Sequence, residues 1–339
     1  MNIVVISPPI LRTPPEDYGG IEASAWVLCK GLAHRGHSVT LFGRHDSFRP
    51  PNGGVLLTYD DEKNLVSGFG NINLFDVVID FTHEKYLSVA HPDWPVINTY
   101  SVMSLTGNGI NPVFISRGQK AGKFPNVDGP VIHYGLDLDE YPMYEGPRDD
   151  YLLYMGQVIP EKRVEWACEA AIATNRPLVI AGPWWGGPDY DKILNDYRDK
   201  YPDLIRVVGS VGGQQKIGLL QKAHALIHPV GAKEWCEAGA IVVLESLAVG
   251  TPVIVSDNGC LPEYVLEDNT GSLSVSPVGF MSSTLDGFIQ GVSYNIDPKN
   301  CRRRAEDFSM ARMSKEYEDL AIKVMGGLRW NTGASSNVS

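Results

Sequence analysis

The chain has 339 residues, of which 43% are hydrophobic and 20% charged, as in ordinary soluble globular proteins. This length leaves room for two domains, each with its own hydrophobic core. The formal net charge of −11 argues against non-specific binding to nucleic acid or to an anionic membrane, because both need a basic surface.

The cysteines and the first residues bear on the compartment. Five cysteines without any CxxC pair indicate reduced thiols in a cytosolic protein, not a disulfide framework or a zinc site. The start, "MNIVVISPP", lacks a basic n-region and is typical of a first strand, not of a signal peptide. No stretch reaches the roughly 18 uncharged apolar residues of a membrane span. We therefore expect a cytoplasmic protein without a transmembrane segment.

Short apolar runs alternate with helical patterns in the first half of the chain. Buried strands are expected at 3–7, 39–42, 77–79 and 96–97. Between the first two, Ile21, Ala25, Leu28 and Leu32 recur at helical spacing, and Gly36 ends the helix. This βαβ unit implies a parallel sheet covered by helices on both faces.

A second series begins after the loop at 141–150, which is rich in proline, glycine and charge. Strands are expected at 151–155, 177–182, 205–210, 224–230 and 251–256, with a helix that places Val164, Ala167, Cys168 and Ala171 on one face. The fold class expected is α/β, with two doubly wound Rossmann-like domains. Ligands of such domains bind beyond the carboxyl ends of the strands, so we expect a cleft between the two.

Two segments contain groups suited to an anion. Gly19 and Gly20 fall between the first strand and the first helix, where backbone N–H groups and the helix dipole favour negative charge. They do not form GxGxxG, and a plain tight turn is favoured on this segment alone. In "YMGQVIPEKR", Gln157 and Lys162 follow a strand end and would lie near a phosphate; alternatively Lys162 and Arg163 are solvated at a helix start.

The most informative stretch is "KEWCEAGAIVVLESLAVGTPVIVS". It places Glu237 and Glu245 in an apolar segment, where a carboxylate costs several kcal/mol unless it is paired. If a helix begins near Gly239, Glu237 lies just before its N-terminus and Glu245 nearly two turns inside. Two carboxylates beside exposed amides suit a ligand rich in hydroxyls. The alternative is that Glu245 pairs with a buried arginine or caps backbone amides.

The E-x7-E spacing in "CEAGAIVVLE" resembles the signature of retaining glycosyltransferases of the GT-B fold, family 4, the glycosyl transferases group 1. Other motifs agree in order: "YGGIE" is similar to the first glycine loop, "HRGHSVTLF" to the second strand, and "YMGQVIPEKR" and "LVIAGP" to the start of the second domain. The likeness covers roughly residues 1–325. Short members from antibiotic and polysaccharide pathways, with "YGGI" early and "WCE" before "NGCL" late, are the most similar.

The resemblance implies domain bounds. It implies an acceptor-side domain at 1–147, a nucleotide-sugar-binding domain at 148–309, and a helix at 310–330 that crosses back to the first domain. The polar stretch 331–339 is expected to be a disordered tail.

The resemblance also implies site residues. Catalytic roles are implied for Glu237, His83 and Lys162. Donor-binding roles are implied for Gly19, Gly20, Gln157, Arg163, Gly239, Ala240 and Glu245. Tyr100 and Ser101 are acceptor candidates. Trp184 and Trp185 in "GPWWGGPDY" are further acceptor candidates on their chemistry, because indole rings stack on sugars or bases; the alternative is half-buried packing at the domain edge. Lys162 would neutralise the departing diphosphate, and such electrostatic stabilisation is usually the largest catalytic term.

This chain departs from the family pattern at three places. Gln157 stands where the family has an arginine, and Arg163 stands where a glycine is usual. Tyr100 or Ser101 stands where a histidine is expected in the first domain. These substitutions bear on donor affinity and donor identity, not on the fold.

The implied activity is a retaining, metal-independent transfer of a hexose from a nucleoside-diphosphate sugar, UDP-glucose-like or GDP-mannose-like, to a hydroxyl acceptor. The acceptor would be a sugar, a lipid-linked sugar or a small metabolite. No cofactor, metal or nucleic-acid partner is expected, and the D-x-D pairs at Asp137/Asp139 and Asp189/Asp191 are interpreted as ordinary loop acids. The alternatives are a GT-B nucleotide-sugar epimerase and a non-catalytic nucleotide-sugar binding protein.

Overall fold

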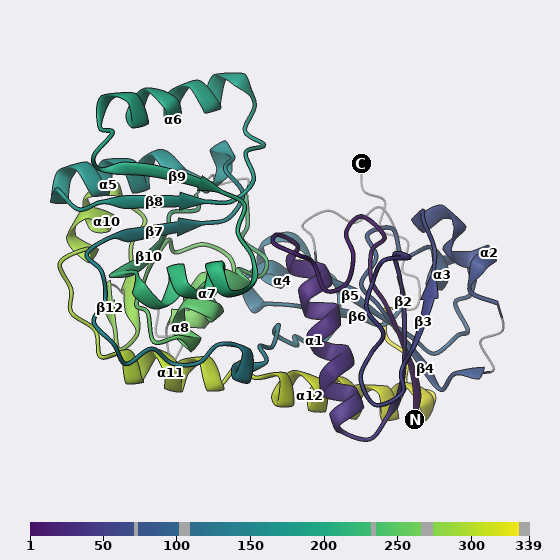
Figure 1. Cartoon of the computed structure of the whole chain (residues 1–339). Helices are drawn as coiled ribbons and strands as arrows, with labels where there is room; N and C mark the ends of the chain where they lie inside the picture. The colour runs from purple at the N-terminus through teal and green to yellow at the C-terminus, as the bar shows by residue number, and fades with distance from the viewer. Residues whose placement is uncertain (71–73, 102–108, 232–234, 266–273, 332–339) are drawn as a thin grey trace. The chain divides into compact units, whose positions relative to one another are not determined.

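The computed structural model describes residues 1–70, 74–101, 109–231, 235–265 and 274–331. The chain forms two compact units (Figure 1). Unit 1 comprises residues 1–15, 19–136 and 309–339, and unit 2 comprises residues 16–18 and 137–308. The tail predicted at 331–339 lies, apart from Asn331, outside the described residues.

The division after residue 136 precedes the predicted boundary at 147 because the loop at 141–150 is not a free linker. The Tyr144 N–H donates to the Val249 carbonyl oxygen at 3.1 Å, and the Tyr141 hydroxyl donates to Glu245 at 2.7 Å. Both partners belong to unit 2. These hydrogen bonds fix the loop to unit 2 although its composition is that of a linker.

Unit 1 contains a six-stranded parallel sheet in the order β3-β2-β1-β4-β5-β6, the arrangement of a doubly wound nucleotide-binding fold. Its strands are β1 (Asn2–Ile6), β2 (Ser38–Gly43), β3 (Val55–Thr58), β4 (Val77–Asp80), β5 (Val96–Tyr100) and β6 (Pro112–Phe114). Its helices are α1 (Gly20–His34), η1 (Glu62–Asn64), α2 (Leu65–Gly68), α3 (Tyr86–Ala90), α4 (Arg117–Lys123) and α12 (Met310–Met325). The strands and the helix predicted in this half are confirmed.

The last helix of the chain packs against the first helix of unit 1 (Figure 1). A Cβ atom on Gly31 of α1 would lie 2.7 Å from the Ser314 Cβ of α12, so only glycine permits this approach. The Tyr317 hydroxyl lies 2.8 Å from the Thr99 hydroxyl of β5, which fixes α12 to the sheet.

Unit 2 contains a seven-stranded sheet in the order β12-β13-β11-β10-β7-β8-β9, parallel except for the pair β12 and β13. Its strands are β7 (Leu152–Met155), β8 (Leu178–Ala181), β9 (Ile205–Gly209), β10 (Ala225–His228), β11 (Val253–Val255), β12 (Ser274–Ser276) and β13 (Gly279–Met281). Its helices are η3 (Leu138–Glu140), η4 (Pro160–Lys162), α5 (Val164–Thr174), α6 (Pro188–Lys200), α7 (Gly213–Lys222), α8 (Ile241–Ala248), α9 (Leu261–Val265), α10 (Leu285–Gly291) and α11 (Pro298–Glu306).

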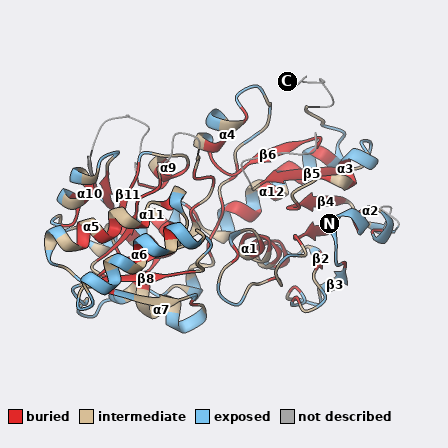
Figure 2. Ribbon diagram, turned by 90° about the horizontal axis from the view of Figure 1, so that it is seen from above, coloured by how far each residue is buried: buried red, intermediate tan, exposed pale blue. Residues whose placement is uncertain are grey.

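In each unit the central strands are buried and most helices keep an exposed outer face (Figure 2). β4, β5, β7, β8 and β10 are buried along their whole length, whereas the edge strand β3 is largely exposed. The all-apolar runs of the sequence therefore correspond to strands covered on both faces.

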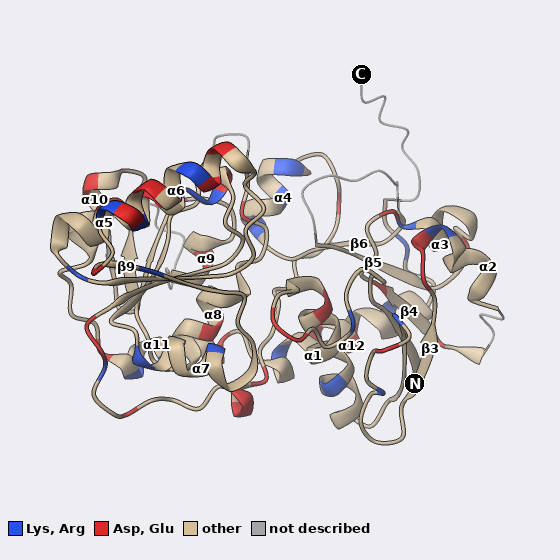
Figure 3. Cartoon of the chain, turned by 45° about the horizontal axis from the view of Figure 1, so that its top comes forward, with Lys and Arg blue, Asp and Glu red and all other residues tan. Residues whose placement is uncertain are grey.

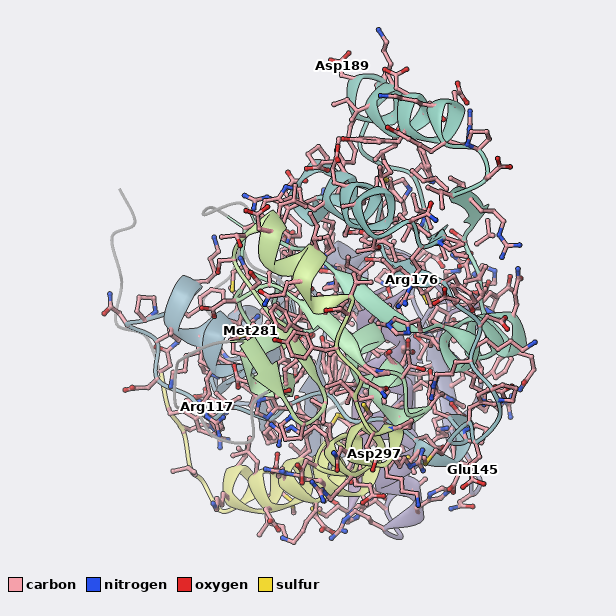
Figure 4. The ribbon with its side chains drawn as sticks, turned by 90° about the vertical axis from the view of Figure 1, so that its left-hand side faces the viewer. Arg117, Glu145, Arg176, Asp189, Met281 and Asp297 are labelled. Carbon is pink, nitrogen blue, oxygen red and sulfur yellow. The ribbon has the colours of Figure 1, made fainter. Side chains whose placement is uncertain are left out.

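Charged side chains lie mainly on these outer faces. Helix α6 carries both signs, with Asp189 and Asp191 in its first turn and Arg198 and Lys200 in its last (Figure 3). This order complements the helix dipole. Arg176, which follows α5, pairs with Asp150 at 3.0 Å (Figure 4).

Candidate functional site

The carboxyl ends of three neighbouring strands of unit 2 carry polar loops. Lys162 follows β7, Glu237 follows β10 and Asn258 follows β11, and these strands lie side by side in the sheet order β11-β10-β7. In parallel α/β sheets, ligands bind beyond this edge. The three loops therefore form the candidate site of unit 2.

Glu237 and Lys162 form a buried ion pair. They are 8% and 7% exposed, and the Lys162 ammonium donates directly to Glu237 Oε2. The ammonium also lies 5.8 Å from the centre of the Trp235 ring. Each charge therefore compensates the other in a region that excludes most water.

The environment keeps Glu237 ionised. Burial alone would raise its pKa, but the Lys162 charge and the nearby His228 more than offset that effect and lower the pKa to about 2. A carboxylate accepts hydrogen bonds and cannot donate them. Glu237 is thus available to accept hydroxyl groups.

His228 is a member of this cluster that the sequence did not reveal. It is the last residue of β10 and is 2% exposed, and its Nε2 lies 3.6 Å from Glu237 Oε2. Among the described residues, neither ring nitrogen has a hydrogen-bond partner. Burial lowers the pKa of His228, and the Lys162 charge acts in the same direction while Glu237 opposes it. A neutral imidazole is the form that this position favours.

The loop after β11 holds the backbone around Glu237. The Glu237 N–H donates to Asn258 Oδ1 at 2.8 Å, and the Asn258 side-chain amide donates to the Trp235 carbonyl at 2.9 Å. The Cys260 N–H donates to the Glu237 carbonyl at 2.7 Å. These bonds explain why the "WCE" and "NGCL" segments belong together.

Gly259 stands at the closest point of this contact. Its φ is +56°, and a Cβ atom there would lie 2.0 Å from the Glu237 carbonyl oxygen. Both the backbone angle and the space therefore require glycine.

Helix α8 begins at Ile241, after Gly239 and Ala240. The prediction that the Ala240 amide binds the donor is not supported by its position, because this N–H donates to Cys260 Sγ at 3.3 Å and the residue is 5% exposed. Gly239 is half-buried. Its predicted role stays a prediction.

Glu245 lies in the second turn of α8 and is 3% exposed. Its Oε1 accepts the Tyr141 hydroxyl at 2.7 Å and the Lys216 ammonium from α7. Glu245 thus pairs with a lysine and a tyrosine, and not with the buried arginine expected as one alternative. Its Oε2 is buried and has no hydrogen-bond partner among the described residues. One carboxylate oxygen is therefore held in place while the other remains unpaired.

The side chain of Arg163 turns to α5. Its guanidinium lies 4.6 Å from the centre of the Trp166 ring. Arg163 also has φ +45°, in the left-handed region that favours glycine, which explains why a glycine fits this position. Gln157 is half-buried and its carbonyl accepts the Tyr154 hydroxyl at 2.5 Å. The donor-binding role predicted for Arg163 stays a prediction.

In unit 1, Gly19 has φ +149° and directly precedes α1, with Gly20 exposed as its first residue. A Cβ atom on Gly19 would lie 2.9 Å from Leu11 and Pro15 and 3.1 Å from the Glu22 carboxyl group. Glu22 is 5% exposed, and burial raises its pKa. The buried Glu22 carboxyl group therefore lies directly beside the glycine loop.

His83 lies after β4 and is tied to Glu62 of η1. His83 Nδ1 lies 2.8 Å from Glu62 Oε1, and the backbone N–H groups of His83 and Glu84 donate to the same carboxylate at 3.0–3.1 Å. The His83 side chain is 30% exposed. The sequence reasoning selected His83 but not the acid that holds it.

The acceptor candidates differ in their surroundings. Tyr100 is 1% exposed and packs with Phe114 and Phe124, so this core position does not support contact with an acceptor. Ser101 is half-buried, and its hydroxyl has no hydrogen-bond partner among the described residues. In unit 2, Trp184 packs against the core, whereas Trp185 is 59% exposed.

The D-x-D pairs have local roles. Asp137 caps η3, and Asp189 and Asp191 lie in the first turn of α6. Among the described residues, no group of three His, Cys, Asp or Glu side chains converges as metal ligands would. In the same part of the chain, no helix has the length and apolar character needed to cross a membrane.

Residues 145–291 match the family described as glycosyl transferases group 1. This stretch contains Lys162, Glu237 and Glu245. This part of the chain is therefore similar to the group 1 glycosyltransferases.

Solved structures of glycosyltransferases resemble the whole chain. AviGT4, a glycosyltransferase involved in avilamycin A biosynthesis, has a TM-score of 0.80 and 26% identity, covering 97% of this chain and 99% of AviGT4. HepE of Anabaena, solved in complex with UDP and glucose, has a TM-score of 0.65 and 13% identity, covering 95% of this chain and 100% of HepE. The likeness to AviGT4 confirms the predicted GT-B fold class.

Curated relatives match only in part. Glycogen synthase of Mycobacterium tuberculosis is 29% identical over 200 residues, which are 56% of this chain and 44% of that protein. The lipopolysaccharide 1,2-N-acetylglucosaminetransferase of Salmonella typhimurium is 26% identical over 180 residues, which are 50% of this chain and 45% of that protein. The chain thus spans less than half the length of the curated relatives it matches.

Proposed function

We propose that the chain is a group 1 glycosyltransferase, a retaining, metal-independent enzyme that moves a hexose from a nucleoside-diphosphate sugar to a hydroxyl acceptor. One observation carries the proposal. Lys162 and Glu237 meet at the carboxyl edge of the unit 2 sheet, and in helix α8, which follows, Glu245 has a buried Oε2 that no described residue pairs. A cation and two carboxylates match the phosphate and hydroxyl groups of such a donor.

The proposed roles follow from charge and burial. Lys162 neutralises the diphosphate as it departs, because a buried cation stabilises developing negative charge more strongly than a solvated one. Glu237 accepts hydroxyls of the transferred sugar. Glu245 accepts a ribose hydroxyl through Oε2, since Tyr141 and Lys216 already occupy Oε1. Gly19 and Gly20 approach the diphosphate, and His83 contacts the sugar near its reacting carbon.

The proposed chemistry balances without a covalent enzyme intermediate. The acceptor oxygen forms a bond to the anomeric carbon on the face from which the diphosphate leaves. The bond between that carbon and the phosphate oxygen breaks, and the departing phosphate takes the acceptor's proton. The anomeric configuration is retained. This part of the proposal rests on the family resemblance.

The donor is proposed to be UDP-glucose-like or GDP-mannose-like, and the acceptor a sugar, a lipid-linked sugar or a small metabolite. The complex of HepE with UDP and glucose supports a search that starts with uridine nucleotides. The second candidate function is a non-catalytic nucleotide-sugar binding protein. Gln157 favours it because it stands where the family has an arginine, and without that charge a donor can still bind while its leaving group is poorly stabilised.

Thermal unfolding against a ligand panel tests the donor site. The panel is UDP, GDP, ADP, UDP-glucose, UDP-GlcNAc, GDP-mannose and NAD. A ligand at 100 times its Kd adds about 2.7 kcal/mol to the free energy of unfolding, which raises Tm measurably. We expect a selective shift with one base. No shift with any member, in folded protein, would overturn the proposal.

Product analysis then separates the candidate functions. A transferase consumes the selected sugar nucleotide only with an acceptor and keeps the anomeric configuration. Isomerisation of the donor without acceptor would indicate an epimerase. Binding without transfer or hydrolysis, across a broad acceptor panel, would indicate the binding protein.

Glu245→Gln should weaken binding of the selected ribonucleotide about tenfold, because a neutral amide is a poorer acceptor than a carboxylate for a hydroxyl. Titration calorimetry with the ribonucleotide and its 2′-deoxy form measures the change, and the loss should be smaller for the deoxy form. Glu165→Gln is the matched control, since Glu165 is a half-buried carboxylate that, like Glu245, accepts a tyrosine hydroxyl, from Tyr190 at 2.5 Å. Equal losses in both variants would remove Glu245 from the site.

A further inference from the structure

In unit 1, Glu62 of η1 and His83 in the loop after β4 form a carboxylate–imidazole pair, and the proposed roles use only the histidine. Glu62 and His83 are 21 residues apart in sequence and meet through Oε1 and Nδ1 at 2.8 Å. The Glu62 side chain is 11% exposed. Most of its hydrogen-bonding capacity is directed to residues 83 and 84.

Glu62 fixes both the backbone and the ring. The His83 N–H lies 3.1 Å from Oε1 and 3.0 Å from Oε2, and the Glu84 N–H lies 3.0 Å from Oε2. Burial alone would raise the pKa of Glu62, but the bonds from His83 and from the two amides more than offset that effect and lower it. Glu62 is therefore a carboxylate, which can only accept hydrogen bonds.

This geometry determines the tautomer of neutral His83. Because Glu62 accepts at Oε1, the proton of the neutral ring must lie on Nδ1. Nε2 then carries a lone pair and accepts a hydrogen bond. A hydroxyl donor, but not a carbonyl, is the complementary group.

Other charged groups face this pair. Glu22 of α1 interacts electrostatically with His83, and Tyr59, just after β3, with Glu62. Lys85 lies 1% exposed just before α3, and its ammonium donates to the carbonyl oxygens of Asp80 at 3.0 Å and Thr99 at 2.9 Å, and to that of Thr82. The Lys85 ammonium also pairs with Asp80 Oδ1 at 3.7 Å and interacts electrostatically with Glu62. Glu62 is therefore the group that directly contacts the His83 ring.

We propose that Glu62 is a positioning residue that holds His83 with its proton on Nδ1, so that Nε2 accepts a hydroxyl of the donor sugar. This inference rests on the proposed function for the identity of that hydroxyl. The tautomer itself depends only on the contact between Glu62 and His83. The two parts can therefore be tested separately.

The first measurement is the tautomer. Histidine-labelled protein is examined by ¹H–¹⁵N NMR at alkaline pH, and the His83→Gln variant assigns the His83 signals. We expect the Nδ1-protonated pattern in the native protein. Glu62→Gln should produce a mixture or the Nε2-protonated pattern, because the Gln amide group can donate to Nδ1.

Asp61→Asn is the matched control. Asp61 precedes Glu62, and its side chain accepts from the Lys63 N–H at 2.9 Å to cap η1, away from His83. The control removes the same charge and should keep the native tautomer. An Nε2-protonated native ring, or an unchanged tautomer in Glu62→Gln, would overturn the inference.

The second measurement is turnover as a function of pH. Glu62→Gln should lower kcat/KM about tenfold, the loss expected for one well-oriented hydrogen bond, and change the dependence of kcat/KM on pH. Nucleotide affinity and the Asp61→Asn profile should not change. A lower Tm with an unaltered tautomer and profile would show that Glu62 only supports the backbone. Failure of transfer in native protein would contradict the proposed function, while the NMR result would still decide the tautomer.

Discussion

Glu237→Gln should fold normally and lose sugar transfer by roughly 10²- to 10³-fold, the range seen when one electrostatic contact to the reacting groups is removed. The substitution keeps the shape of the side chain, and the Gln oxygen can still accept from the Lys162 ammonium. It removes the charge that is proposed to bind the sugar hydroxyls. Steady-state kinetics with the donor selected by the panel measures the loss.

The alanine variant is a less clean test. Glu237→Ala leaves Lys162, which is 7% exposed, as a buried cation without its partner. Removing one member of a buried pair typically costs about 3–5 kcal/mol. Urea unfolding should show that loss for Glu237→Ala and a smaller but measurable loss for Glu237→Gln, because the Gln oxygen still accepts from Lys162 but no longer neutralises its charge. Unchanged turnover in a folded Glu237→Gln would contradict the assignment of Glu237 to the site.

The same carboxylate predicts how stability depends on pH. The pKa of Glu237 is about 2 in the folded protein against an ordinary value of 4.5, so the unfolded chain binds more protons in this range. The stabilisation is therefore present above pH 4.5 and is lost as the pH falls towards 2. Urea unfolding at several pH values should show a shallower loss in this window for Glu237→Gln than for the native protein.

His228 acts at higher pH in the same direction. Its pKa is lowered from 6.5 in the folded protein, so its contribution is lost as the pH falls below 6.5. The two groups therefore cover adjacent windows. An equal slope in native protein and Glu237→Gln below pH 4.5 would show that Glu237 is not the depressed carboxylate.

Gly259→Ala should lower the free energy of unfolding by about 3 kcal/mol or more, because left-handed strain and overpacking combine. The added Cβ would lie 2.0 Å from the Glu237 carbonyl oxygen, and backbone cannot move aside as a flexible side chain can. The segment that carries Glu237 must shift. We expect transfer activity to fall together with stability.

Gly213→Ala provides the comparison. Gly213 has φ +50°, close to the +56° of Gly259, but a Cβ atom there would meet nothing within 4 Å. This control should cost only about 1–2 kcal/mol, for the backbone angle alone, and leave transfer unchanged. Urea unfolding and kinetics on both variants separate the cost of the left-handed backbone angle from the cost of the steric clash with Glu237. Similar losses of stability and activity in the two variants would show that the loop after β11 does not contact the Glu237 backbone closely.

The fold was predictable because most of its strands are continuous apolar runs. The segments at 3–6 and 151–155 cannot face water on either side, and that pattern indicates parallel strands under helices. The loop at 141–150 could not be predicted in the same way. Its attachment depends on Tyr141 and Tyr144, and nothing in a Pro- and Gly-rich sequence states which unit its tyrosines contact.

The site was predictable where a buried charge had to be explained. Glu237 and Glu245 were identified because carboxylates in apolar segments need a partner or a ligand. The partners of these two acids were not identified, because they are distant in the sequence. Lys162 is 75 residues from Glu237, and Lys216 is 29 residues from Glu245. His228 followed an ordinary strand pattern, and Glu62 was one of many loop acids. The order of acids and bases along the chain does not reveal which of them meet.

The assembly of unit 1 has a consequence for synthesis on the ribosome. Its core is completed by α12, whose Ser314 packs at Gly31 and whose Tyr317 binds Thr99, and Trp330 then closes on Asn111, its N–H donating to Asn111 Oδ1 at 3.1 Å. These partners emerge long after the first strands, because all but three residues of unit 2 lie between them in the chain. While unit 2 is being translated, the apolar surface of unit 1 that α12 covers in the finished protein is therefore still exposed. Domains generally fold as units during synthesis. We therefore expect unit 1, although its first strands are made first, to complete its core after unit 2.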